Sequence, residues 1–297
     1  MSDLTKTVLP APTKGAALTR ALKSFALLRE SPVGMAGAAL VAFWIGVAIF
    51  APLIAPFAPN AQLLPMAKPG TVFPGGGTFW LGTDQLGRDV LSRIVWGSRT
   101  VLVYAPLATV CAYSVGIVMG LAAGYYRGRL DEVLSFVANA ILSFPVLVLY
   151  VLVISTVGPS GLNIVIAITF ASAPAIMRIV RGLVLDLRNR DYIAAAQTRG
   201  ESPWYIMLVE ILPNARGPLI VDACLRLGYV VITIGVLGFL GLGLPPPDPD
   251  WGGMINFSRS LALVFPHMTL FPCLAISSLI LGFNLLADGL REISLRD

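Results

Sequence analysis

Six long apolar runs constrain this chain more than any other feature of its sequence. Each has about 20 mostly apolar residues, which is the length an α-helix needs to cross the hydrocarbon core of a bilayer. Only 12% of the residues are charged, whereas a typical soluble domain has about 25%. The sequence therefore predicts an all-α integral membrane protein with six transmembrane helices. The runs cover 33–53, 101–124, 133–157, 162–180, 219–244 and 265–286.

The distribution of Lys and Arg predicts how the chain is oriented. If the N-terminus lies inside, the segments on the outer side carry only Lys68, Arg88, Arg93, Arg99 and Arg259, and most of the other basic residues lie inside. Cytoplasmic segments accumulate Lys and Arg, so both termini are predicted to be cytoplasmic. The net charge of +5 is thus a topology signal, and it does not indicate nucleic-acid binding.

Four parts follow from this topology. Residues 1–32 form a cytoplasmic tail, 33–100 the first helix and a long extracytoplasmic loop, 101–290 the transmembrane core, and 291–297 a second cytoplasmic tail. The first tail has apolar residues at helical spacing, with basic residues between them, which is typical of an amphipathic helix on the membrane surface. A flexible, solvated tail is the alternative. The apolar positions are Leu18, Leu22, Phe25 and Leu28.

Two features of the apolar runs concern helix packing and shape. Gly116, Gly120 and Gly124 recur at four-residue spacing, so they share one helix face and predict close contact with a neighbouring helix. Pro145 and Pro174 each remove a backbone hydrogen bond and are expected to kink their helices.

A few polar or aromatic residues near the membrane invite a functional interpretation. Asp222 and Arg226 lie four residues apart, where they can pair on one helix face. They either line a pathway or lie near the inner interface with Arg226 extended towards water, and the second is slightly favoured. Trp251 and His267 are expected at the outer interface.

The segment 191–218 is the most organised of the cytoplasmic segments. Asp191 suits a helix N-terminus, Gly200 suits the left-handed residue that ends a helix, and Ser202 with Pro203 suits the start of a second helix. We expect Pro213 to break that second helix and Asn214 to cap the next span. The small residues Ala194, Ala195 and Ala196 would let the first helix sit in a partner's groove. A hairpin lying on the bilayer is an equal alternative.

A second polar segment lies on the outer side, before the run at 101–124. Asp84 is expected to cap a short helix whose polar face carries Arg88, Asp89, Ser92 and Arg93. This face either meets a partner protein or belongs to an interfacial helix without a partner.

The sequence contains no motif of a catalytic site. It has no GxxxxGK[ST] phosphate loop, no GxSxG and no HExxH. The chain is therefore predicted not to be an enzyme and to hold no metal or cofactor. If it transports a solute actively, the energy must come from another subunit or from an ion gradient.

Three blocks of the chain resemble the permeases of ABC importers. Segment 191–218 is similar to their coupling motif at Ala195, Ala196, Gly200, Leu212 and Pro213. The blocks LGTDQLGRDVLSRIVWGSRT and LGLPPPDPDWGGMI are similar to signatures of the dipeptide, oligopeptide and nickel subfamily, in its shorter permease. The first of these blocks supplies the candidate outer-site residues Gly82, Thr83, Asp84, Gly87, Arg88, Asp89, Ser92 and Arg93. Two departures alter the charge of the coupling motif: Ala194 replaces its leading glutamate, and Glu210 stands where histidine is common.

The resemblance implies a type I importer permease in a bacterial inner membrane. It implies a second homologous permease, two cytoplasmic ATPases that hold ATP and Mg²⁺, and an extracytoplasmic binding protein that delivers peptides or similar small solutes. The residues expected to contact the ATPase are Asp191, Tyr192, Ala194, Ala195, Ala196, Gly200, Glu210, Leu212 and Pro213. The alternatives are a nickel, opine or glutathione importer of the same family, or a self-contained secondary transporter or channel.

Overall fold

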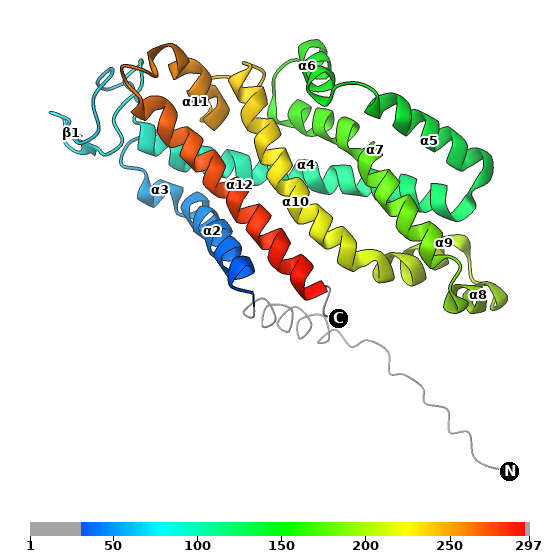
Figure 1. The fold of residues 1–297 in the computed structure, drawn as a ribbon. Helices are drawn as coiled ribbons and strands as arrows, with labels where there is room; N and C mark the ends of the chain where they lie inside the picture. The colour runs from blue at the N-terminus through cyan, green and yellow to red at the C-terminus, as the bar shows by residue number, and fades with distance from the viewer. Residues whose placement is uncertain (1–30, 295–297) are drawn as a thin grey trace.

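The structure is a computed structural model that describes residues 31–294. The amphipathic helix expected within the first tail lies outside these residues. Within them the chain is a bundle of long helices with a small β-hairpin at one end (Figure 1). The long helices are α2 Pro32–Ile49, α4 Val90–Tyr126, α5 Gly128–Leu142, α6 Val146–Val157, α7 Gly161–Leu187, α10 Leu212–Phe239 and α12 His267–Ser294.

The prediction of six membrane spans is confirmed, with one of them broken. Five helical stretches of the described chain are long and apolar enough to cross a membrane, and the pair α5 and α6, bent by 89°, is the sixth when the two helices are counted as one span. We expected only a kink at Pro145. Pro145 instead lies directly before α6, because a proline disfavours helical backbone in the residue that precedes it. Pro174, in contrast, lies inside the continuous helix α7.

Helices α4 and α7 pack against each other through the three glycines. Gly116, Gly120 and Gly124 all lie on the face of α4 that meets α7, against Ile176, Val180 and Val184 respectively. A Cβ atom on Gly120 would lie 2.5 Å from the Cβ of Val180. The two helix backbones are therefore as close as glycine allows.

Helices α2, α10 and α12 lie side by side along the other part of the bundle (Figure 1). Their facing side chains join those of α4 and α7 in the main apolar core, which includes Trp44, Ile168, Ile234 and Leu279. A second core at the other end of α4 and α7 includes Leu121, Val180 and Met207.

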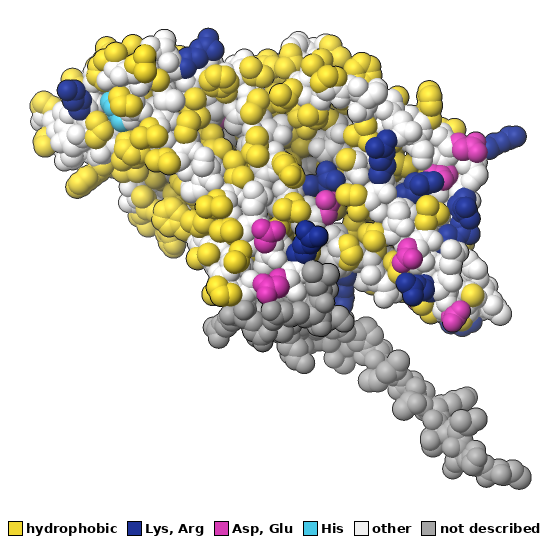
Figure 2. Space-filling model, viewed as in Figure 1, with side chains coloured by type: hydrophobic (Ala, Val, Ile, Leu, Met, Phe, Trp, Pro, Cys, Tyr) yellow, Lys and Arg dark blue, Asp and Glu magenta, His cyan; other side chains and the backbone are white. Residues whose placement is uncertain are grey.

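The bundle has two distinct ends. One end, the loop end, consists of segments 55–89 and 240–266, with α3 Ala51–Ile54 leading into it; it includes β1 Thr71–Val72, β2 Thr78–Phe79, α11 Trp251–Ser258 and the 3₁₀ turn η2 Arg259–Leu261. The other, the hairpin end, consists of residues 191–211, which form α8 Asp191–Thr198, α9 Pro203–Tyr205 and η1 Ile206–Ile211. Figure 2 shows most of the visible charged side chains towards the part of the bundle that carries α5, α8 and α9.

Candidate functional site

The hairpin end has the helix, turn and helix that its residues predict. Gly200 has φ +76°, a left-handed conformation that glycine adopts without strain. The Ser202 hydroxyl accepts a hydrogen bond from the Tyr205 backbone N–H at 3.2 Å, and Pro203 follows at the first helical position. Arg190 occupies the N-cap position of α8, so Asp191 lies in the first turn, where its charge meets the helix dipole.

The expected break at Pro213 is wrong. From Pro203 the chain stays helical through to Phe239, because η1 is a π-helix whose wider turns lead directly into α10. Pro213 lies in the first turn of α10, where its missing N–H is tolerated. Asn214 does not cap a helix; its side-chain amide donates to the Glu210 carbonyl at 2.6 Å.

The hairpin has one buried and one exposed apolar face. Ile193, Ile206, Met207 and Ile211 pack against the end of the α4–α7 pair. The exposed face carries large side chains, among which Trp204 is 53% exposed. The other large exposed residues are Tyr192, Tyr205, Leu208 and Val209.

We had expected the three alanines of α8 to face a partner together, but they lie on different faces of the helix. Ala196 is fully buried beside Ile193, whereas Ala194 and Ala195 are exposed. Consecutive residues of an α-helix are about 100° apart, so three of them cannot all face one partner. Only Ala194 and Ala195 offer a small, open contact surface.

Glu210, one of the two departures from the coupling motif, forms an ion pair with Arg199. The Arg199 guanidinium lies 3.5 Å from the Glu210 carboxylate and 3.7 Å from that of Glu201. Leu212, in contrast, is half-buried at the start of α10.

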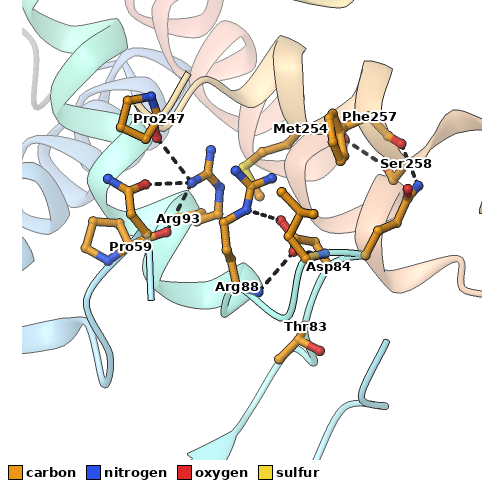
Figure 3. Close-up of polar contacts among 12 residues, drawn as sticks. Pro59, Thr83, Asp84, Arg88, Arg93, Pro247, Met254, Phe257 and Ser258 are labelled. Atoms are coloured by element: carbon orange, nitrogen blue, oxygen red, sulfur yellow. Dashed lines mark hydrogen bonds and ion pairs between the residues drawn. The ribbon is translucent and has the colours of Figure 1, made fainter. Parts of the chain in front are cut away.

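At the loop end, Asp84 holds a turn and does not cap a helix. Its Oδ1 accepts hydrogen bonds from the backbone N–H groups of Leu86 and Arg88, and its Oδ2 pairs with Arg88 Nε at 2.6 Å (Figure 3). Asp89 is the helix cap instead, because its carboxylate accepts from the Ser92 N–H at 2.7 Å and α4 begins at Val90. The predicted short helix is thus the first part of α4.

The remaining residues of this signature tie the loop together. The Thr83 hydroxyl accepts from the Ala67 N–H at 2.8 Å, and Ser92 Oγ accepts from the Phe57 N–H at 3.1 Å. Gly82 and Gly87 both have positive φ. All eight signature residues except Arg88 are buried, so their polar face is turned into the loop and away from a partner.

Arg93 joins three segments of the loop end. Its Nη1 donates to the Pro59 carbonyl at 3.1 Å and to Asn60 Oδ1 at 3.0 Å, and it reaches the Pro247 carbonyl at 3.4 Å (Figure 3). Near it, burial raises the pKa of the Asp250 carboxyl to about 6, against hydrogen bonds from backbone N–H groups that lower it. Burial likewise raises the pKa of Asp89.

Two residues expected at the outer interface are buried instead. Trp251 is 0% exposed, and its Nε1 donates to the Ile94 carbonyl at 2.9 Å. His267 is also buried, with its Nε2 3.4 Å from the Thr83 carbonyl. Trp251 packs against Trp44 of α2 and against α4, whereas His267 lies against the long loop, whose folding back onto the bundle the local sequence does not reveal.

The pair Asp222–Arg226 forms in the middle of the bundle. Arg226 Nε donates to Asp222 Oδ2 at 2.7 Å, and the Tyr113 hydroxyl also donates to Asp222. Tyr113 lies at the centre of the apolar run 101–124, so the pair is deeper than the position near the inner interface that we had favoured. Arg226 lines a small cavity between α4, α6, α7 and α10.

Comparisons with known proteins identify relatives over most of the chain. The family model described as "Binding-protein-dependent transport system inner membrane component" matches residues 116–297. A second, described as "N-terminal TM domain of oligopeptide transport permease C", matches residues 23–69.

Individual relatives agree with these families. The glutathione transport system permease protein GsiD of Pectobacterium atrosepticum is 40% identical over 213 residues, which are 72% of this chain and 71% of the relative. The dipeptide transport system permease protein DppC of Alkalihalophilus pseudofirmus is 35% identical over 271 residues, which are 91% of this chain and 88% of the relative.

A solved structure shares the fold. The MetNI methionine ABC transporter, in an inward-facing conformation, has a chain that matches with a TM-score of 0.56 and 19% sequence identity. The match covers 69% of this chain and 96% of the transporter chain. At this identity the likeness concerns the fold alone, which is that of a type I importer permease.

Proposed function

Because the chain belongs to the family of inner-membrane components of binding-protein-dependent transport systems, we propose that its hairpin end docks on an ATPase subunit. The chain is a multi-pass permease subunit of an ABC importer, similar to DppC and OppC permeases. Two ATPases bind and hydrolyse ATP with Mg²⁺, and a second, homologous permease completes the pathway. This chain itself contributes no catalytic residue.

The observation that carries the docking proposal is the two-faced hairpin. Its buried face is anchored in the core of α4 and α7, while Trp204, Tyr205 and Leu208 remain exposed on the other side. Exposed aromatic residues of this size are typical of protein interfaces. Ala194 and Ala195 allow a partner's backbone to come close. A movement of the ATPase would then reach the bundle directly.

The orientation that we propose puts the hairpin end and both termini in the cytoplasm. The excess of Lys and Arg on that side supports this orientation. The loop end then lies outside, where a substrate-binding protein delivers the solute. Since the signature residues are turned inward, they stabilise the loop, and its exposed surface makes the contact.

The solute that we propose is a peptide or a similar small molecule. The name of the relative GsiD specifies glutathione transport, and that of DppC specifies dipeptide transport. A nickel or opine complex is the alternative within the family.

The test is uptake into proteoliposomes that contain the complete importer. We expect uptake that requires the ATPases, ATP and the binding protein together. Omitting the ATPases should abolish it, and a permease pair alone should be inactive. Uptake by this chain alone would instead identify a self-contained transporter or channel and reject the proposal.

A further inference from the structure

The ion pair Asp222–Arg226 lies inside the helical bundle, beside a small cavity. Tyr113 is at the centre of its apolar run, and Arg226 is near the middle of α10. Charged residues at this depth are expensive and usually face a polar cavity or a pathway. The position of Arg226 therefore points to a role in the passage of the solute.

The geometry of the pair leaves part of Arg226 available. Asp222 meets the guanidinium at Nε, 2.7 Å away. Among the described residues, Tyr113 is the other side chain within hydrogen-bonding reach of the guanidinium, so donors of Nη1 and Nη2 remain for a second acceptor. A guanidinium presents its donors in a fixed fork that matches both oxygens of a carboxylate. Arg226 can thus keep its bond to Asp222 and bind another carboxylate at the same time.

The cavity that Arg226 lines has the size and polarity for such a group. Its volume is about 50 Å³. One water needs about 10–15 Å³ by this measure, so a group of three or four heavy atoms fits, as in a carboxylate. Five hydroxyl-bearing side chains line the space, and three of them, Thr109, Tyr113 and Thr233, already donate their O–H within the chain, which leaves Tyr150 and Ser172 to donate to a bound group.

We propose that Arg226 binds the carboxylate of the transported solute as it passes the middle of the membrane. Asp222 neutralises the arginine while the site is empty, and Tyr113 holds Asp222 in place through its hydroxyl. This deepens the proposed function, on which it rests, because it assigns the solute class: organic acids or zwitterions with a free carboxylate. Cations without a carboxylate would gain nothing from this site.

Direct binding of a small carboxylate tests the site without ATP and without a known solute. The complete importer in nanodiscs is titrated with acetate and, separately, with acetamide, which has nearly the same shape but no charge. Saturation-transfer NMR measures the binding. We expect acetate to bind and acetamide to bind at least tenfold more weakly, since a charge-assisted hydrogen bond contributes about 1.5–3 kcal/mol.

Variants assign that binding to Arg226. The double substitution Asp222→Asn with Arg226→Gln removes both charges, so it leaves no unpaired charge in the membrane and should still fold. We expect it to reduce acetate binding at least tenfold. Arg178→Gln, on α7 outside the cavity, is the matched control and should retain binding. Acetate binding that persists in the double variant, or that is absent from the wild type, overturns the proposal.

A transport measurement then tests whether the transported solute itself binds at Arg226. Uptake of a transported acid is compared with that of its amide, for the wild type and the double variant. The same binding protein serves both proteins, so its own preference cancels. We expect the double variant to reduce the ratio of acid to amide uptake at least tenfold. An unchanged ratio contradicts the assignment of the site to the solute. If the wild type shows no uptake at all, the proposed importer function is rejected, while the acetate titration still tests whether Arg226 binds a carboxylate.

Discussion

The Arg199 guanidinium lies 3.5 Å from the carboxylate of Glu210, across the turn of the hairpin. Glu210 was one of two departures from the coupling motif, and we had expected it to change the charge offered to an ATPase. Its side chain is 25% exposed and its charge has a partner within the same hairpin. The departure is thus partly compensated inside the chain.

Substituting Glu210 should therefore have a small effect. We expect Glu210→Gln to change the free energy of unfolding by less than about 1 kcal/mol, because partly exposed ion pairs contribute little. Copurification of the ATPase should remain within about twofold of the wild type, whereas loss of the complex would show that the ATPase uses this carboxylate directly.

The two neighbouring alanines of α8 should respond differently to the same change. Ala195 is exposed and Ala196 is buried. We expect Ala195→Asp to weaken copurification of the ATPase and leave the purified permease stable. Ala196→Asp should destabilise the hairpin by about 3 kcal/mol or more, because it buries an unpaired carboxylate. Thermal unfolding of the permease distinguishes them, and equal stability of the two variants would argue against this placement of α8.

Gly200 allows a test of bulk at the docking surface. A Cβ atom there meets nothing within 4 Å, so only the backbone conformation limits the substitution. We expect Gly200→Trp to reduce ATP-driven uptake at least tenfold while the permease remains folded and expressed. Gly200→Asn is the control, because asparagine tolerates the left-handed region. It should keep most of the uptake. Normal uptake by the Trp variant would move the docking surface elsewhere.

The contact between α4 and α7 predicts opposite effects at two glycines. Gly120→Ala places a Cβ atom 2.5 Å from Val180 and should destabilise the permease by about 1–3 kcal/mol. Gly182→Ala, on α7, meets nothing within 4 Å and should be neutral or stabilising by up to about 1 kcal/mol. Unfolding temperatures in detergent measure both, and a similar loss in both variants would contradict the tight contact.

The buried carboxyl of Asp250 predicts a dependence of stability on pH. Its folded-state pKa of about 6 exceeds the ordinary value of 3.8, so between these values the folded protein binds a proton that the unfolded chain does not. Stability should therefore fall as the pH rises from about 4 to about 6, by on the order of 1–3 kcal/mol, and level off above. Asp250→Asn retains a capping oxygen and does not titrate. The difference in unfolding temperature between wild type and variant should follow this range; a constant difference would refute it.

Much of the fold and the hairpin could be predicted from the sequence because their signals are local. The length of the apolar runs predicts the spans. Ser202 and Pro203 predict a helix start, because the cap and the first helical position lie within one turn. Gly116, Gly120 and Gly124 mark a helix face in the same way.

The errors concern contacts between distant segments. Trp251 and His267 look interfacial beside their own neighbours, but Trp251 packs against α2 and α4, and a loop that begins near residue 55 covers His267. Asp222 contacts Tyr113 of α4, and the π-helix just before Pro213 carries Ile206, Met207 and Ile211, which are buried against α4 and α7. None of these partners is visible in a local pattern.

The unbroken helix from Pro203 to Phe239 also has a mechanical meaning. Arg226 and the exposed Trp204 belong to one continuous rod, separated by 22 residues of helical backbone without a hinge loop. A twist applied at the hairpin end therefore turns the arginine about the same axis, and the wider π turns and Pro218 inside α10 are where part of it can be absorbed. A movement of the hairpin and a rearrangement of the polar cavity are therefore coupled through one helix.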